Sequence, residues 1–193
     1  CPQKSNGPVS CWGRNDRGQL GDGSNTTGTT PVTVANLSGV TAVDSGWLHT
    51  CAAKSDGTVD CWGYNGDGQL GLGNTTDRNT PATIPALAGV TTIGVGAYHG
   101  CAVKAGGTVA CWGYNKDGQA GDGTTSVNRK SPVDVVGLTG AKSVAGGSYT
   151  NCAVKASGAT LCWGLNWHGR LGDGTGTTRT TPVQVAYPNP IVR

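Results

Sequence analysis

Four copies of one eleven-residue unit account for all eight cysteines of the chain. The unit at 51–61, CAAKSDGTVDC, runs directly into Trp-Gly, and so do its counterparts at 1–11, 101–111 and 152–162. As a β-hairpin, the unit places its two cysteines opposite each other and ends its turn on a glycine. These glycines are Gly7, Gly57, Gly107 and Gly158. Facing cysteines on antiparallel strands are close enough to bond. The repeat therefore predicts the disulfides Cys1–Cys11, Cys51–Cys61, Cys101–Cys111 and Cys152–Cys162.

The hairpins belong to a longer repeat of about 50 residues. Each repeat continues into a polar loop, a third strand, and a fourth strand that follows a Leu-x-Gly turn. The third strands are expected to begin on proline, a position that strands tolerate, at Pro31, Pro81, Pro132 and Pro182. The fourth strands are expected at 40–43, 90–93 and 141–144. Four short strands per period, separated by glycines, are typical of a propeller blade.

The sequence therefore predicts an all-β fold, a β-propeller of four-stranded blades with about four repeats. We interpret 1–193 as one repeat domain with units 1–50, 51–100, 101–151 and 152–193. A single small sheet cannot bury both of its faces, so neighbouring blades must stack. The expected core between blades includes the repeated tryptophans and leucines Trp12, Trp62, Trp112, Trp163, Leu20, Leu70 and Leu171.

Composition favours a location outside the cell or at its surface. Local disulfides indicate an oxidising compartment, because cytosolic thiols are kept reduced. The formal net charge is only +3, and the 14 basic residues form no run, so nothing indicates a nucleic-acid partner. No apolar stretch approaches the roughly 18 residues of a membrane-spanning helix. The chain starts at Cys1 without a methionine, and we therefore expect a processed or excised product.

The repeat also resembles a known family. The motifs are H-T-C-A at 49–52, G-T-V-x-C-W-G-x-N at 57–65, G-Q-L-G-D-G at 18–23 and T-P-V at 30–32. Together they resemble the repeat of the regulator of chromosome condensation family, in its secreted, disulfide-containing bacterial style. The resemblance implies a β-propeller, commonly of seven blades, that binds partners through loops on one face. It does not carry over the family's guanine-nucleotide exchange activity, because no residues here support that transfer.

Both ends of the sequence leave the repeat incomplete. No counterpart of 40–50 precedes Cys1, and 187–193 replaces the Leu-x-Gly turn and stops where a fourth strand would begin. Four repeats cover little more than half of a seven-bladed ring, so blade faces and strand edges are expected to be exposed at both ends. Exposed strand edges tend to pair with another chain. We expect self-association through open blade edges, or excision from a longer propeller, in preference to a closed four-bladed monomer.

Aromatic residues in ordered loops are the candidates for partner contact. Trp167 and His168 break the repeat at a place where the other copies carry charged or small loop residues. Trp47, Tyr98 and Tyr149 share one repeat position, and two interpretations stay open for them: contact residues, or part of the core. All five are named here as predicted partner contacts.

Catalysis and metal binding find little support in the sequence. Every cysteine is assigned to a disulfide, and the chain contains no Glu. The Asn- and Asp-containing loops lack the full set of oxygen donors of a calcium loop and are interpreted as turns. His49 and His99 share a repeat position, which indicates packing or strand-end hydrogen bonding. We therefore predict no catalytic residue, no cofactor and no metal ligand.

The predicted function is that of a secreted, non-catalytic scaffold for protein interaction or self-assembly at the cell surface. Two alternatives stay open. One is a secreted enzyme inhibitor, similar to the β-lactamase inhibitor proteins that share this fold. The other is a carbohydrate-binding module.

Overall fold

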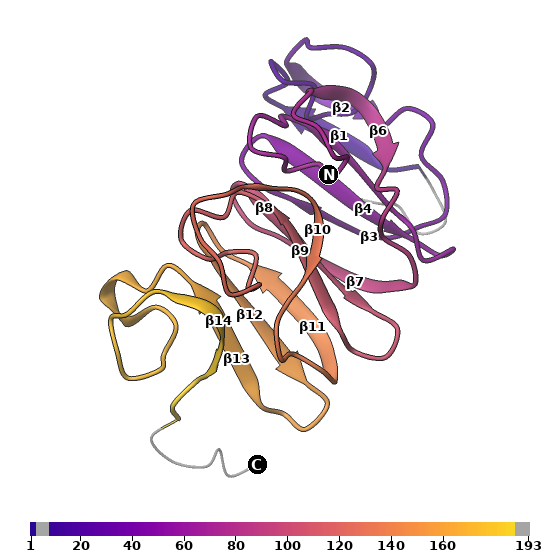
Figure 1. Ribbon diagram of the computed structural model, residues 1–193. Coiled ribbons are helices and arrows are strands. Elements are labelled where there is room, and N and C mark those ends of the chain that lie inside the picture. Colours follow the sequence, from indigo (N-terminus) through magenta and orange to yellow (C-terminus); the bar gives the residue numbers. More distant parts are fainter. Residues whose placement is uncertain (3–7, 188–193) are drawn as a thin grey trace.

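Four antiparallel sheets follow one another along the chain in the computed structural model, which describes residues 1–2 and 8–187. The first sheet has two strands, β1 (Ser10–Gly13) and β2 (Gly28–Thr33), and each of the other three has four. Figure 1 shows the sheets side by side in chain order, from indigo to yellow. The chain thus has the all-β architecture of propeller blades that the sequence predicts, arranged as an open series.

The strands keep their sequence order within every sheet. The second sheet contains β3 (Val40–Ser45), β4 (His49–Lys54), β5 (Val59–Gly63) and β6 (Arg78–Thr83). The third contains β7 (Val90–Val95), β8 (His99–Lys104), β9 (Val109–Gly113) and β10 (Arg129–Asp134). The fourth contains β11 (Ala141–Gly146), β12 (Thr150–Lys155), β13 (Thr160–Gly164) and β14 (Arg179–Gln184). The inner strands β3, β7 and β11 pack against one another, so they form the inner side of the series.

The cysteine hairpins form as the repeat predicts. Cys51 lies opposite Cys61 and Ala53 opposite Val59 in the pairing of β4 with β5, and Gly57 has a φ of 79° in the turn. All four predicted disulfides are present, with Cα atoms 4.1 to 4.2 Å apart. The turn glycine expected at Gly7 and the chain end at 188–193 lie outside the described residues. In the second, third and fourth sheets, the bonded hairpin therefore supplies the two central strands.

The prolines of the third strands do not lie where they were predicted. Pro81 is the fourth residue of β6, not the first, and Pro31, Pro132 and Pro182 occupy the same place in their strands. β6 pairs only with β5, and its register is irregular between Cys61 and Gly63. In an edge strand with such an irregularity, some backbone amides make no hydrogen bond to the neighbouring strand. Proline, which has no amide hydrogen, can therefore occupy such a position.

Three apolar cores lie between consecutive sheets. The first brings Leu20, in the loop between β1 and β2, together with Trp62 of the second sheet. The next joins Leu70 to Trp112, and the third packs Val135 against Trp163. Burying a tryptophan side chain removes a large apolar area from water, at about 25 cal/mol per Å². Stacking of sheet on sheet is thus the source of most apolar burial, as the repeat predicts.

Trp12 is the exception among the repeated tryptophans, and its expected burial was wrong. Its side chain is 52% exposed, whereas Trp62, Trp112 and Trp163 are fully buried. Each buried tryptophan packs against the sheet that comes before its own. Trp12 belongs to the first sheet, so no described residue covers it in the same way.

Candidate functional site

Four aromatic rings from loops of the second, third and fourth sheets form one cluster on the surface, which we call the aromatic cluster. Its members are Trp47, Tyr98, Tyr114 and Tyr149. The ring of Tyr98 lies 5.2 Å from Trp47 and 6.1 Å from both Tyr114 and Tyr149. Tyr114 and Tyr149 are 6.0 Å apart in an edge-on arrangement. Such tilted ring pairs at 4.5 to 7 Å are favourable beyond the area they bury.

The cluster is built from one repeated turn. Trp47, Tyr98 and Tyr149 each lie between the inner strand of a sheet and the strand beside it. Neighbouring turns are hydrogen bonded to each other: the Trp47 amide donates to the Ala97 carbonyl, and the Ala97 amide donates to the Gly147 carbonyl, both at 3.2 Å. A side chain at Gly46 would collide with the Gly96 carbonyl. The turns can therefore approach closely enough for their rings to touch.

The aromatic cluster is distinct from the cores between the sheets. None of its four rings belongs to those cores; Trp47 is 63% exposed, and Tyr98, Tyr114 and Tyr149 are half-buried. The rings thus lie outside the cores, and the assignment of Trp47, Tyr98 and Tyr149 as partner contacts stays a prediction. Tyr114 was missed because it lies in a polar loop, and its repeat position, shared with Tyr64, gave no sign that it faces the other rings.

Charged residues border the aromatic cluster. The Lys116 ammonium lies 5.8 Å from the ring centre of Tyr114, within cation–π range. Burial, with smaller contributions from neighbouring tyrosines and Asp67, raises the pKa of the Tyr98 hydroxyl. Burial and the nearby Asp117 likewise raise the pKa of Tyr114. Both hydroxyls are therefore neutral at physiological pH and can donate or accept hydrogen bonds.

Trp167 and His168, the other predicted contacts, lie elsewhere. They form a short 3-10 turn, Trp167–Gly169, in the loop after β13. Trp167 is 66% exposed, and His168 is exposed with a left-handed φ of 59°. No ring contact joins Trp167 to the aromatic cluster within residues 8–187. The five predicted residues therefore form two separate patches.

His49 and His99 are buried at the starts of β4 and β8. A ring nitrogen of His99, Nε2, lies 2.9 Å from Oδ1 of Asn151 in the next sheet. Burial lowers the pKa of His99 to about 4, and burial together with the nearby His99 lowers the pKa of His49 to about 3. Both imidazoles are neutral in the folded protein at physiological pH, where they pack between sheets.

The polar loops are held by buried asparagines. In the second repeat, Oδ1 of Asn65 accepts from the Leu70 amide at 2.9 Å, and Nδ2 donates to the carbonyls of Asn74 and Thr76 at 3.1 Å. Asn15, Asn115 and Asn166 accept from their own loop amides in the same way. These asparagines therefore stabilise the loops in which they lie. Within 1–2 and 8–187, no three His, Cys or Asp side chains are grouped to hold a metal ion.

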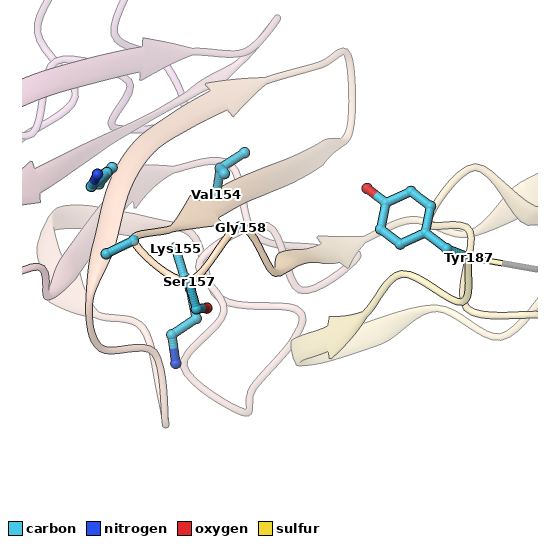
Figure 2. Close-up of a pocket in the computed structure, with 7 residues that line it drawn as sticks. Val154, Lys155, Ser157, Gly158 and Tyr187 are labelled. Carbon is cyan, nitrogen blue, oxygen red and sulfur yellow. The ribbon is translucent and has the colours of Figure 1, made fainter. Parts of the chain in front are cut away.

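A cavity of about 640 Å³ opens on the outer face of the fourth sheet. Figure 2 shows Val154, Lys155 and Tyr187 among the residues that line it. Tyr187 also hydrogen bonds through its hydroxyl to Oγ1 of Thr160 at 3.1 Å. The cavity is lined by aliphatic, lysine and hydroxyl groups, without a histidine, carboxylate or free thiol that could perform acid–base or nucleophilic chemistry.

A family model described as "Regulator of chromosome condensation (RCC1) repeat" matches residues 6–53, 56–103 and 106–154, which is more than half of the chain. A second model with the same description matches 40–69 and 90–119. The chain belongs to the RCC1 repeat family. A comparison with curated proteins gives no match.

Two solved structures share the fold of this chain. Human WBSCR16 is 22% identical with a TM-score of 0.79, over 91% of this chain and 46% of that protein. Yeast RCC1 (Prp20), in a structure with bound Kap60, is 22% identical with a TM-score of 0.80, over 94% of this chain and 45% of that one. The chain thus spans less than half the length of these two relatives. No helix in its described part is long and apolar enough to cross a membrane.

Proposed function

We propose that this RCC1-repeat chain is a secreted, non-catalytic scaffold that binds a protein partner through the aromatic cluster. The observation that carries the proposal is the gathering of Trp47, Tyr98, Tyr114 and Tyr149 on one surface. Tryptophan and tyrosine are enriched among residues that dominate binding energy. Their rings bring a large contact area at a low cost in conformational entropy.

Secretion is supported by the cysteines. All eight are paired within the hairpins, a pattern that persists in oxidising compartments and is rare in the cytosol. The same pattern resembles the secreted bacterial members of the family. On this ground we propose a location outside the cell or at its surface.

A non-catalytic role is supported by the state of the reactive groups. His49 and His99 are fully buried, and their lowered pKa values make them poor proton donors and acceptors near pH 7. The cysteines are bonded, and the carboxylates near the cluster, Asp67 and Asp117, hydrogen bond to Gln69 and Gln119 of their own loops. These states of the reactive groups support a binding role for the aromatic cluster.

The relatives support a protein as the partner class. The yeast RCC1 structure contains bound Kap60, and Prp20p from Saccharomyces cerevisiae is described together with its binding properties to Gsp1p and histones. Those partners belong to those proteins. For this chain we propose only that a protein surface or peptide occupies the aromatic cluster.

Random peptides displayed on phage provide the test. Peptides selected on the wild-type chain should bind the Trp47→Ala and Tyr149→Ala variants at least about tenfold more weakly, because hot-spot truncations cost about 2 kcal/mol or more and about 1.4 kcal/mol already corresponds to a factor of ten. Val127→Ala, which removes an exposed apolar side chain of another loop, is the control and should leave binding unchanged. Peptides that bind both aromatic variants as tightly as wild type would contradict the proposal.

The two alternative functions, a carbohydrate-binding module and an enzyme inhibitor, can be tested with the same purified wild-type and variant proteins. Binding to a glycan array that is lost in the Trp47→Ala variant would favour a carbohydrate-binding module. Stoichiometric loss of β-lactamase activity on mixing would favour an inhibitor.

We also propose that the scaffold self-associates through its terminal sheets. Trp12 on the first sheet and Val154 on the fourth are exposed large apolar residues at repeat positions whose counterparts in the middle of the series are buried. Exposed apolar positions of this kind mark interaction sites.

A further inference from the structure

The aromatic cluster carries four hydrogen-bonding groups that the chain itself leaves unused. They are the indole N–H of Trp47 and the hydroxyls of Tyr98, Tyr114 and Tyr149. None of the four makes a hydrogen bond to any group within residues 1–2 and 8–187. A buried indole is treated differently, since the N–H of Trp112 donates to the Gln69 carbonyl at 2.8 Å. The surface of the cluster therefore combines apolar ring faces with free hydrogen-bond donors.

These groups lie on the loop side of the series of sheets and not on the faces at its two ends. Tyr98 belongs to the middle one of three turns, and Trp47 and Tyr149 contact its ring from the turns before and after it. Tyr114 approaches the same ring from the loop after β9. The Tyr98 hydroxyl is thus free although a sheet lies on each side of its own. Its freedom does not depend on where the series begins or ends.

A cavity of about 250 Å³ lies beside the same three turns. Trp47 lines it directly, and Tyr98 and Tyr149 each follow a lining residue, Ala97 and Ser148. Glycines of the three turns make up much of the remaining wall, and none of the described residues that line the cavity is charged. A ligand that lies across the rings therefore meets an uncharged hollow next to them.

We propose that the aromatic cluster binds a proline-rich segment of the partner protein in the polyproline II conformation. The inference rests on the proposed function, because it names the part of a protein partner that the cluster recognises. A polyproline II chain has no internal hydrogen bonds, so its carbonyls are free acceptors, and proline has no N–H to donate. Such a chain complements a surface of apolar rings and free donors. Its conformation is also formed before binding, which lowers the entropy cost of docking on an aromatic surface.

The spacing of the rings matches such a chain. A polyproline II helix rises about 3.1 Å per residue, so the steps of 5.2 Å from Trp47 to Tyr98 and 6.1 Å from Tyr98 to Tyr149 each correspond to about two residues. The row of three rings therefore covers about four residues of the ligand. Because the rings contact one another, they form a ridged surface and not a cage that could enclose a small cation.

The charges that border the aromatic cluster are few and of both signs. The Lys116 ammonium lies beside the ring of Tyr114, and the charges of Asp67 and Asp117 reach the tyrosine hydroxyls. Both carboxylates also accept hydrogen bonds from glutamine side chains of their own loops. A surface without a large excess of one sign attracts a highly charged ligand only weakly. An uncharged proline-rich segment therefore suits it better than a polyanion or a strongly charged peptide.

Fluorescence anisotropy with labelled decaproline tests the proposal on the oxidised 193-residue chain. Wild type should bind decaproline at least about tenfold more tightly than a Gly-Ser repeat peptide of equal length, because the flexible peptide loses more conformational entropy. Tyr98→Phe and Trp47→Phe keep an aromatic ring and remove a donor, so each should weaken binding by about three- to tenfold, the equivalent of one hydrogen bond. Tyr187→Phe, which removes a hydroxyl that bonds to Thr160 on the fourth sheet, is the control and should leave binding unchanged. Circular dichroism checks that each variant is folded.

Three results would each overturn the proposal: no binding of decaproline at about 1 mM, equal binding of the Gly-Ser peptide, or an unchanged affinity in either Phe variant. A glycan that occupies the cluster in place of a peptide would give the first of them. The outcome is separable from that of the proposed function. Phage-selected peptides that depend on Trp47 and Tyr149 but are not enriched in proline would leave protein binding intact and reject the proline-rich segment. If no selected peptide depends on these two residues, the proposed function itself fails.

Discussion

Buried imidazoles link the stability of this protein to pH. Burial lowers the pKa of His49 to about 3 and that of His99 to about 4, against about 6.5 in an unfolded chain. Below pH 6.5 the unfolded chain therefore binds protons that the folded chain does not, which favours unfolding. The contribution to stability is fully present above pH 6.5 and is lost as the pH falls toward 4.

We expect the free energy of unfolding to fall by on the order of 3 kcal/mol between pH 7 and pH 5, at up to about 1.4 kcal/mol per pH unit for each histidine. Urea unfolding at the two pH values measures it. The His49→Gln/His99→Gln variant should lose most of this dependence, while His168→Gln, a change at an exposed histidine, should keep it. An equal fall in the double variant and in wild type would contradict the assignment.

At the level of the hairpin, the disulfide limits the freedom of the unfolded chain. Cys101 and Cys111 are ten residues apart in sequence, directly opposite in the β8–β9 pairing, and fully buried. Closing such a loop stabilises the fold by roughly 3 kcal/mol in the chain-entropy model. Trp112 directly follows Cys111 and packs against the preceding sheet. An ordered hairpin therefore also supports the contact between the two sheets.

Replacing both Cys101 and Cys111 by alanine should therefore lower the free energy of unfolding by about 3 kcal/mol. Urea unfolding of the oxidised protein measures the change. The same pair of substitutions at Cys152 and Cys162 closes an equal loop and should cost a similar amount. Unchanged unfolding midpoints in both variants would show that the bonds do not stabilise the arms.

The hairpins and their bonds could be predicted because they are local. Register within eleven residues follows from the period of two and the turn glycine, so the pairing of Cys51 with Cys61 was readable from the sequence. The fourth strands of the repeat were predicted to begin at Val40, Val90 and Ala141. The strands β3, β7 and β11 begin at these residues. The position of Pro81 within β6 could not be predicted. It depends on the edge position of this strand and on the irregular register of its pairing with β5, which exist only in the assembled sheet.

Features that depend on several sheets could be predicted only in part. The repeat indicated that tryptophans fill the contacts between blades, but the exposure of Trp12 follows from its place at the end of the series. Likewise, Trp47, Tyr98 and Tyr149 could be grouped by repeat position, whereas the approach of Tyr114 requires the stacking of the third and fourth sheets. The single-domain interpretation of 1–193 stays a prediction.

The arrangement of the sheets divides the six tryptophans into two classes. Trp62, Trp112 and Trp163 lie between sheets, whereas Trp12, Trp47 and Trp167 are more than half exposed. Hydroxyl-radical footprinting of the dilute, oxidised chain, read out by mass spectrometry, reports the accessibility of all six in one experiment. We expect rapid oxidation of Trp12, Trp47 and Trp167 and strong protection of the other three. Oxidation of Trp62, Trp112 and Trp163 at comparable rates would contradict the stacking of each sheet on the one before it.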